Sequence, residues 1–91
     1  MNNEVIDAGM AQNLQNKAIL ENDLWIWAVY QNPEEFPGKF IARPWSTKLH
    51  GSFGFVLVGD TLKALRAQLP WGLTWMERDE DDEPGVVETW L

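Results

Sequence analysis

The densest run of apolar residues lies at positions 24–31, and its pattern predicts a strand. The segment reads Leu-Trp-Ile-Trp-Ala-Val-Tyr-Gln and is rich in β-branched and aromatic residues, which favour extended backbone. Alternation places Trp25 and Trp27 on one face of the strand and Tyr30 on the other. Because both faces are apolar, we expect this strand to be central in its sheet and covered on both sides.

Two turns follow this strand. The Asn-Pro pair at 32–33 is typical of the start of a type I turn, and the Pro-Gly pair at 37–38 suits the centre of a type II turn. Glycine supplies the positive φ that the type II turn requires. Phe36 lies between the two turns, and we expect its ring to be tucked inward and to hold the loop.

A second strand is predicted over residues 39–47, returning beside the first. Alternation puts Arg43 and Trp45 on one of its faces. Pro44 interrupts this strand, and a proline has no amide N–H to donate to a neighbouring strand. We therefore expect the strand to lie at an edge of the sheet or to bulge at Pro44.

The C-terminal half of the chain predicts one helix and three short strands. The helix spans residues 60–69, with Asp60 as its N-cap, a leucine stripe on one face and Pro70 at its end. A helix of this length is stable only when it packs on a sheet. The predicted strands cover residues 55–58, 73–77 and 86–91, and the polar segment 46–54 is predicted to be a turn.

Residues 1–23 form an N-terminal segment that we expect to be partly helical or flexible. Asp7 can cap a helix over residues 8–20, in which Met10 and Leu14 begin an apolar stripe at helical spacing. The stripe is weak for a core helix. This helix is expected to pack at the sheet edge, to lie across a partner subunit or to fray.

Residues 24–91 are predicted to form a single α+β domain. Because the connections between neighbouring strands are short, the first strand should form an antiparallel hairpin with the second, and the fourth with the fifth. The expected architecture is a mostly antiparallel sheet of about five strands with one helix packed across it, plus the weak N-terminal helix.

Six of the 91 residues are tryptophans, and this number changes the picture. The chain also has no cysteine, so it can form neither a disulfide nor a thiolate metal site. Five of the six fall in predicted strands, and Trp71 falls in a turn. One short helix cannot cover both faces of a sheet that carries so many indole rings. The surplus apolar surface predicts a homodimer, or a cleft lined by aromatic side chains.

The net charge of −7 indicates which partners the surface disfavours. Fourteen acidic residues against seven basic ones would repel nucleic acid, unless Lys39, Arg43 and Lys48 form a basic patch. The longest apolar run is seven residues, and the N-terminus has no basic region of the kind that begins a signal peptide. We expect a cytoplasmic protein that binds neither nucleic acid nor membrane.

The acidic run between residues 77 and 83 is the sharpest charge feature of the sequence. Several converging carboxylates can bind a hard cation, and a negative loop can also attract a basic protein partner. The run lacks the spacing of a helix–loop–helix calcium site, so a solvated hairpin loop that keeps a sheet edge soluble is the favoured interpretation. No metal site is predicted.

No set of residues predicts catalysis. Nucleophilic catalysis needs a nucleophile, a base and a group that orients the base. His50 is the single histidine and the chain has no cysteine, so we expect His50 to be an exposed loop residue. Glu88 is better explained as a half-buried partner of Arg43 or Arg78 than as a catalytic acid. Neither a catalytic residue nor a cofactor is predicted.

The remaining candidates concern binding. We expect a non-enzymatic module that binds a protein partner through exposed aromatic and acidic residues. The alternative is a small-molecule-binding protein in which Tyr30 and Trp45 line an aromatic cleft. The candidate surface residues are Trp25, Trp27, Tyr30, Phe36, Arg43, Trp45, Trp71 and Trp90.

Two stretches of the chain resemble a group of short bacterial proteins. The first reads Trp-x-Trp-Ala-Val-Tyr-x-Asn-Pro-x-x-Phe-Pro-Gly-Lys-Phe-Ile-Ala-Arg at 25–43, and the second ends in Val-Val-Glu-Thr-Trp-Leu at 86–91. The likeness covers residues 25–45 and 57–91. The group has no assigned activity, so the resemblance implies membership without a mechanism. Small proteins of this kind often travel on mobile DNA such as phages or integron gene cassettes, and the resemblance implies such a source.

Overall fold

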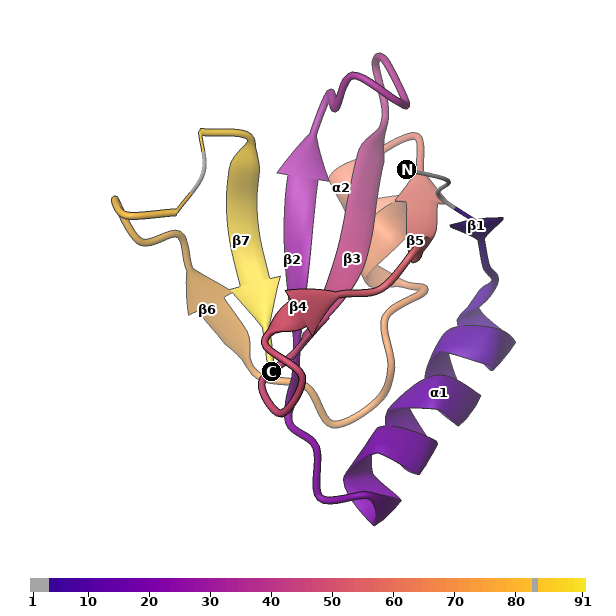
Figure 1. The fold of residues 1–91 in the computed structure, drawn as a ribbon. Helices are drawn as coiled ribbons and strands as arrows, with labels where there is room; N and C mark the ends of the chain where they lie inside the picture. Colours follow the sequence, from indigo (N-terminus) through magenta and orange to yellow (C-terminus); the bar gives the residue numbers. More distant parts are fainter. Residues whose placement is uncertain (1–3, 83) are drawn as a thin grey trace.

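A computed structural model describes residues 4–82 and 84–91 of the chain. Its elements are β1 (Glu4–Val5), α1 (Ala8–Leu20), β2 (Trp25–Gln31), β3 (Phe40–Ser46), β4 (Gly51–Ser52), β5 (Phe55–Gly59), α2 (Leu62–Arg66), β6 (Trp75–Glu77) and β7 (Val86–Trp90). Within the described residues, the seven strands form one mixed sheet in the order β1-β5-β3-β2-β7-β6, with β4 paired to β3 (Figure 1). The predicted α+β class is confirmed, whereas the mostly antiparallel sheet of about five strands is wrong.

Strand β2 is central, as its two apolar faces predict. β3 and β7 flank it and both run antiparallel to it, so that Ala28 lies opposite Arg43 on one side and opposite Thr89 on the other. The two predicted hairpins are the β2–β3 and β6–β7 pairs, and both are present. The register of β7 shifts between Val29 and Tyr30 of β2. This register shift determines which β7 side chains lie on the same face of the sheet as Tyr30.

Strand β3 lies in the interior of the sheet, which corrects the prediction that Pro44 marks an edge. The whole of β3 pairs with β2, and Pro44 lies opposite Trp27. On its other side, residues 40–42 pair with β5 and residues 45–46 pair with β4. Pro44 falls between these two partners, where its carbonyl accepts the Phe53 N–H at 3.3 Å. The missing N–H therefore interrupts neither ladder.

Two short strands are absent from the sequence prediction, because two residues are too few to show an alternating pattern. β4 lies within the segment 46–54 that was expected to be a turn. β1 pairs in parallel with β5, with Glu4 opposite Phe55. The Ile6 N–H also donates to the Val56 carbonyl, at 2.9 Å. This parallel pairing is what makes the sheet mixed, and it fixes the start of α1 beside β5.

Helix α1 occupies the predicted residues and begins at the predicted cap. The Asp7 carboxylate accepts the Met10 N–H at 2.8 Å. Met10, expected in the apolar stripe, is 46% exposed instead. The helix docks through two small residues and one polar side chain, because the Gln15 Oε1 accepts the Trp27 Nε1–H at 2.8 Å. The buried residues of α1 are Ala11, Gln15 and Ala18.

Helix α2 begins later and ends earlier than predicted. Thr61 rather than Asp60 is its N-cap, because the Thr61 hydroxyl accepts a backbone N–H of the first turn at 3.0 Å. Asp60 forms an ion pair with Lys39 instead. The helix ends at Arg66, well before Pro70, and a turn follows it. The short helix still supplies one fully buried side chain, that of Leu65.

Both helices cover the same face of the sheet, and the core lies between them and the strands (Figure 1). Trp27 is fully buried there. Leu65 packs so closely on Gly59 that an added methyl group at Gly59 would lie 2.7 Å from the Leu65 nitrogen. No helix of the described chain covers the opposite face, from which Figure 1 is viewed. The core residues are Ile6, Ala11, Ala18, Trp25, Trp27, Val29, Ala42, Leu57 and Leu65.

Candidate functional site

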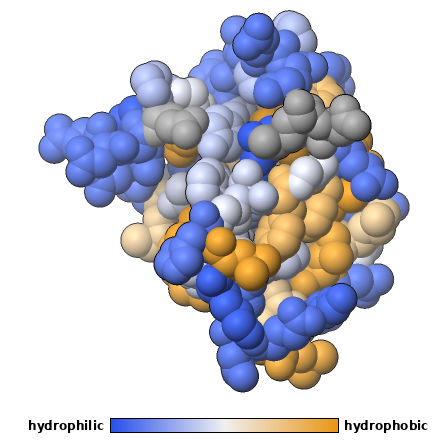
Figure 2. Space-filling model, in the orientation of Figure 1, coloured by the Kyte–Doolittle hydropathy of each residue, from blue (hydrophilic) through white to orange (hydrophobic). Residues whose placement is uncertain are grey.

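The uncovered face of the sheet is hollowed into a groove of about 480 Å³, which we call the open-face groove. Its floor is formed by apolar side chains of the central strands, and its rim is polar. Figure 2 shows this face, with pale and hydrophobic side chains near the centre and hydrophilic side chains toward the periphery. The lining residues are Ile26, Ala28, Tyr30, Trp45, Ser46, Thr47, His50, Asp81, Asp82, Val86 and Thr89.

Strand alternation builds the floor of the groove. Successive side chains of a strand point to opposite faces, so every second residue of β2 shares a side. Trp27 points into the core under the helices, where it is fully buried. Ile26, Ala28 and Tyr30 therefore point away from the helices and into the groove. The same alternation that fills the core thus leaves an apolar surface on the other side.

The irregular pairing of β2 with β7 completes the floor. Ala28 lies opposite Thr89, whereas Tyr30 lies opposite Val86. The extra residue between them shifts the strand register, as a β-bulge does. Because of this shift, Val86 and Thr89 both line the groove although they are three positions apart. A regular strand would turn one of the two into the core.

Tyr30 and Trp45 give the groove its aromatic surfaces. Trp45 is 38% exposed, which is a large free area for an indole ring on a strand. The Arg43 guanidinium carbon lies 5.9 Å from the centre of the Tyr30 ring, in cation–π range. One side of the phenol ring therefore lies against the Arg43 guanidinium. The groove therefore presents a positioned phenol ring and a half-exposed indole on one surface.

The rim of the groove is charged and comes from two separate turns. Asp81 and Asp82 belong to the turn between β6 and β7, and His50 belongs to the turn between β3 and β4. His50 has a φ of 55°, in the left-handed region. The acidic turn is held by its own bonds, since Asp79 N–H donates to the Asp82 carboxylate at 2.9 Å and Arg78 donates to the Asp82 carbonyl at 3.1 Å.

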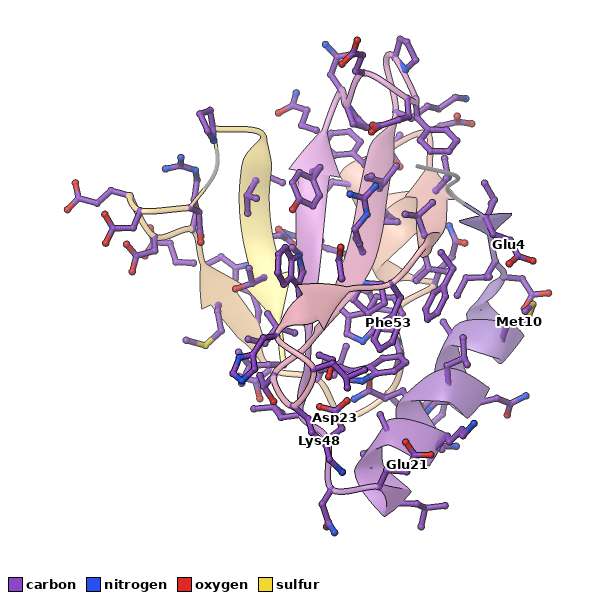
Figure 3. The ribbon with its side chains drawn as sticks, viewed as in Figure 1. Glu4, Met10, Glu21, Asp23, Lys48 and Phe53 are labelled. Atoms are coloured by element: carbon purple, nitrogen blue, oxygen red, sulfur yellow. The ribbon has the colours of Figure 1, made fainter. Side chains whose placement is uncertain are left out.

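The Ser46 hydroxyl, beside the groove, takes part in a hydrogen-bond network within the fold. Ser46 is 1% exposed, and its Oγ donates to Asp23 Oδ2 at 2.6 Å and accepts the Leu49 N–H at 2.9 Å. Partial loss of solvent raises the pKa of Asp23, but hydrogen bonds from Ser46, Trp25 and Lys48 outweigh this effect and lower that pKa. Figure 3 shows Asp23 and Lys48 side by side at this point. A carboxylate with a lowered pKa is a weak base.

Among the described residues, the buried carboxylate is that of Glu88, which lies on the face of the sheet opposite the groove. Glu88 is 3% exposed, and its Oε2 accepts the Arg66 Nε–H at 3.0 Å and the Trp90 indole N–H. Burial raises the pKa of Glu88, but hydrogen bonds from Arg66 and from two indole N–H groups outweigh it and lower that pKa. The predicted partners Arg43 and Arg78 are therefore wrong, and the ion pair ties β7 to α2 instead.

The structure separates the candidate surface residues. Trp25 and Trp27 are 6% and 0% exposed, so they belong to the core, which corrects their assignment to a binding surface. Each indole N–H has a partner within the chain, because Trp25 donates to Asp23 and Trp27 donates to Gln15. Trp90 is half-buried on the same face. These three tryptophans therefore pack in or against the hydrophobic core.

Two further candidates lie in turns outside the groove. Phe36 is half-buried in the turn between β2 and β3. Trp71 is 89% exposed, and its backbone N–H donates to Gln12 of α1 at 2.8 Å, which places it on the helix side of the sheet. Of the eight candidates, the structure brings Tyr30 and Trp45 together in the groove, with Arg43 against the Tyr30 ring.

The sequence pattern did not predict that the polar rim of the groove forms part of a binding site. The acidic run was visible in the sequence, but nothing there places Asp81 and Asp82 across a groove from His50. Both turns reach the groove because β3 and β7 flank β2 on its two sides. Such a juxtaposition depends on strand order rather than on local pattern. The alternation of β2 was the one signal that could have indicated an apolar floor.

A smaller hollow of about 190 Å³ lies between α1 and the sheet. Its wall is aromatic, since the Phe53 ring centre lies 4.7 Å from that of Trp25 and 5.4 Å from that of Phe55. Figure 3 shows Phe53 between the sheet and α1. Lys17 of α1 and Glu21, the C-cap of that helix, line the hollow and carry opposite charges. The hollow is smaller and electrostatically mixed, so the open-face groove is the stronger candidate site.

Comparisons with known protein families, with curated proteins and with solved structures gave no match. Within residues 4–82 and 84–91, no helix has the length and apolar character needed to cross a bilayer. The same residues contain no group of three or more histidine, cysteine or acidic side chains placed to hold a metal ion. Glu83 of the acidic run lies outside the described residues.

Proposed function

We propose that this protein is a non-enzymatic interaction module that binds a segment of a partner protein in the open-face groove. The observation that carries the proposal is the meeting of Tyr30 and Trp45 in one groove of about 480 Å³. Aromatic side chains dominate the energy of protein–protein binding, because they bury large areas with little loss of side-chain entropy. Trp45 is already half-exposed and needs no rearrangement to make such a contact.

The charge around the groove indicates the chemistry of the partner segment. Asp81 and Asp82 border an otherwise apolar floor, and the whole chain carries a net charge of −7. A segment with a lysine or arginine next to an apolar side chain would match both surfaces. The negative field of the protein would also steer a basic partner toward it. We therefore propose a basic, apolar segment as the ligand.

The hydrogen bonds of the Ser46 and Thr47 hydroxyl groups support binding rather than catalysis at these two residues. The Ser46 hydroxyl donates to the Asp23 carboxylate, and the Thr47 hydroxyl donates to the Leu24 carbonyl at 2.8 Å. A hydroxyl acts as a nucleophile when an adjacent base accepts its proton. Both protons are directed to acceptors other than His50, and the one carboxylate involved has a lowered pKa. Neither hydroxyl is activated in this arrangement.

A small-molecule ligand is the second candidate, favoured by the size of the groove. Its volume of about 480 Å³ lies within the range of roughly 300–1,000 Å³ that is typical of small-molecule sites. The same lining would suit a compact aromatic cation, with the ring against Tyr30 and Trp45 and the charge toward Asp81. The two candidates share the site and differ in the size of the ligand.

A pair of tryptophan variants tests the proposal. The immobilised protein selects binders from a random-peptide display library, and the selected peptides are measured against Trp45→Ala and against Trp71→Ala as the matched control. Trp71 is 89% exposed and lies outside the groove. We expect the peptides to pair basic with apolar residues, and their affinity to fall about 10- to 30-fold for Trp45→Ala, the loss typical of a hot-spot aromatic. Trp71→Ala should bind like the wild type.

Other results separate the candidates. Selected peptides that bind Trp45→Ala as tightly as the wild type would overturn the proposal. If no peptide is enriched but small aromatic amines raise the melting temperature of the wild type and of Trp71→Ala, and not that of Trp45→Ala, the second candidate is correct. Ligands of either kind that depend on Trp71 would place the binding site on the helix side.

A further inference from the structure

We propose that the open-face groove takes a proline-rich segment in the polyproline II conformation, with a lysine or arginine at the end beside the acidic turn. The inference rests on the proposed function and specifies the class of its ligand. Three features of the groove, as the described residues form it, carry the inference. The backbone of its floor is already paired, one of its indole N–H groups has no partner, and its acidic side chains lie at one end.

The floor of the groove offers side chains rather than backbone groups. Ala28 and Tyr30 lie on β2, which has β3 on one side and β7 on the other. Their N–H and C=O groups point along the sheet toward these neighbours and not out of the floor. An ordinary extended peptide has an N–H at every residue, and an N–H on this floor would lose its bond to water and find few acceptors in exchange. The floor therefore favours a ligand that lacks N–H groups or bonds them internally.

The indole N–H of Trp45 decides between these two kinds of ligand. Trp25, Trp27 and Trp90 direct their indole N–H groups to acceptors of the same chain. Trp45 has no such acceptor among the described residues, although its ring lines the groove. A helix uses its carbonyl groups internally, whereas a polyproline II segment leaves every carbonyl free and has no N–H at each proline. A proline-rich segment thus supplies the acceptor that the Trp45 donor lacks.

The two aromatic side chains are spaced along the floor as such a segment requires. Trp45 lies opposite Ile26, and Ile26 is four residues from Tyr30 on β2. Four strand residues span roughly 13 Å, and four polyproline II residues, at about 3.1 Å each, span roughly 12 Å. Ala28 lies between Ile26 and Tyr30, where its small side chain leaves room for the ligand. Prolines at the two ends of a five-residue segment can therefore pack on the two rings, as prolines do in aromatic-lined grooves.

The acidic side chains lie at the Tyr30 end of the floor. Tyr30 pairs with Val86, and the turn that carries Asp81 and Asp82 comes just before Val86 in the chain. His50 belongs instead to the turn that follows Trp45, at the other end. A lysine or arginine of the ligand would therefore lie beyond the proline on Tyr30 and pair with the two carboxylates. This charge complementarity fixes which end of the proline-rich segment is basic.

Two peptide libraries of equal length test the class of the ligand. One fixes Pro-Pro-x-Pro-Pro and the other fixes Ala-Ala-x-Ala-Ala, each between random residues, and both are selected on the immobilised protein. We expect the peptides that lose binding to Trp45→Ala to come from the proline library, with lysine or arginine enriched on one side of the prolines. Replacing the prolines of a selected peptide by alanines should weaken its binding at least tenfold, because the segment loses its preformed shape.

Two variants of the protein test the polar contacts. Trp45→Phe keeps an aromatic ring and removes the N–H, and it should weaken binding about 3- to 10-fold, the effect of one neutral hydrogen bond. Asp81→Asn should weaken binding by a similar factor and reduce its dependence on salt. Trp71→Phe and Glu4→Gln are the matched controls and should bind like the wild type. Trp71 lies on the helix side, and Glu4 lies on β1, far from the acidic turn (Figure 3).

The possible results separate this inference from the proposed function. Trp45-dependent peptides that come equally from the alanine library, or that tolerate alanine in place of proline, overturn the inference and leave the groove as the binding site. If neither library yields a Trp45-dependent peptide, both the inference and the proposed function are overturned. Proline-rich peptides that bind Trp45→Phe and Asp81→Asn as tightly as the wild type overturn the two polar contacts, and with them the placement of the ligand.

Discussion

Glu88 shows how one residue links the elements of this fold. It is a carboxylate on a central strand, 3% exposed, and it accepts bonds from the Arg66 guanidinium and from the Trp90 indole. A buried carboxylate is stable only when such donors compensate for its lost hydration. The arrangement ties α2, β6 and β7 to one point, because the Trp75 indole is also a donor.

The lowered pKa of Glu88 makes stability depend on pH. In the unfolded chain this group titrates near 4.5, and in the fold its pKa is lower. Its contribution is therefore fully present above pH 4.5 and is lost as the pH falls through the folded value. We expect Glu88→Gln to lower the free energy of unfolding at pH 7 by about 1–3 kcal/mol, because its donors lose a charged acceptor. Urea titrations at pH 7 and pH 3 should show a smaller acid-induced loss for the variant than for the wild type.

Asp60→Asn is the matched control for this prediction. Asp60 pairs with Lys39 on the surface, and an exposed pair of this kind contributes about 0–1 kcal/mol. Asp60→Asn should therefore lower the free energy of unfolding at pH 7 by no more than about 1 kcal/mol. Equal pH dependence in Glu88→Gln and the wild type would show that the hydrogen bonds to Glu88 do not lower its pKa.

At the scale of the element, the close packing of α2 on β5 is set by one glycine. A Cβ atom at Gly59 would lie 2.7 Å from the Leu65 nitrogen and 2.9 Å from its Cα, and backbone atoms cannot yield as a side chain can. We expect Gly59→Ala to lower the free energy of unfolding by about 1–3 kcal/mol, the usual range for overpacking. Thermal or urea unfolding would measure it.

Gly51→Ala is the control for Gly59→Ala. A Cβ atom at Gly51 has only the Leu49 carbonyl within 4 Å, at 3.9 Å. The change should leave stability within about 0.5 kcal/mol of the wild type. If Gly59→Ala is as stable as Gly51→Ala, then α2 is not packed against β5 as closely as described.

The elements that the sequence predicts are those with a strong local pattern. The alternation of Trp25, Trp27 and Val29 predicts β2 and its central place, and Asp7 predicts the start of α1. β1 and β4 have two residues each and show no pattern, so their pairing depends on distant partners. The cap of α2 was misplaced by one residue, because Asp60 and Thr61 are both good N-cap residues and only tertiary contacts decide between them.

At the scale of the whole molecule, the site was only partly predictable. Tyr30 and Trp45 were named as aromatic residues that could line a cleft, and they do line one groove. Trp25 and Trp27 were named because the sheet carries more indole rings than one short helix can cover, but they are buried, because α1 and α2 both cover their face of the sheet. Composition shows that a chain is rich in indole rings, and it does not show which side of the sheet the helices cover.

The two layers of the molecule therefore have different roles in our account. The helix layer encloses three tryptophans and gives the small chain its core. The bare face of the sheet keeps Trp45 half-exposed above an apolar floor, with Asp81 and Asp82 at the rim. We propose that this bare face is the binding surface and that the helix layer is structural.

An NMR titration tests this claim most directly. ¹⁵N-labelled protein is titrated with a peptide selected from the display library, and the indole and backbone N–H signals are followed. We predict shifts in the Trp45 indole and in the backbone amides of Tyr30 and Thr89, while the Trp71 indole stays unchanged. Shifts centred on Trp71 and α1, with the Trp45 indole unmoved, would contradict the account.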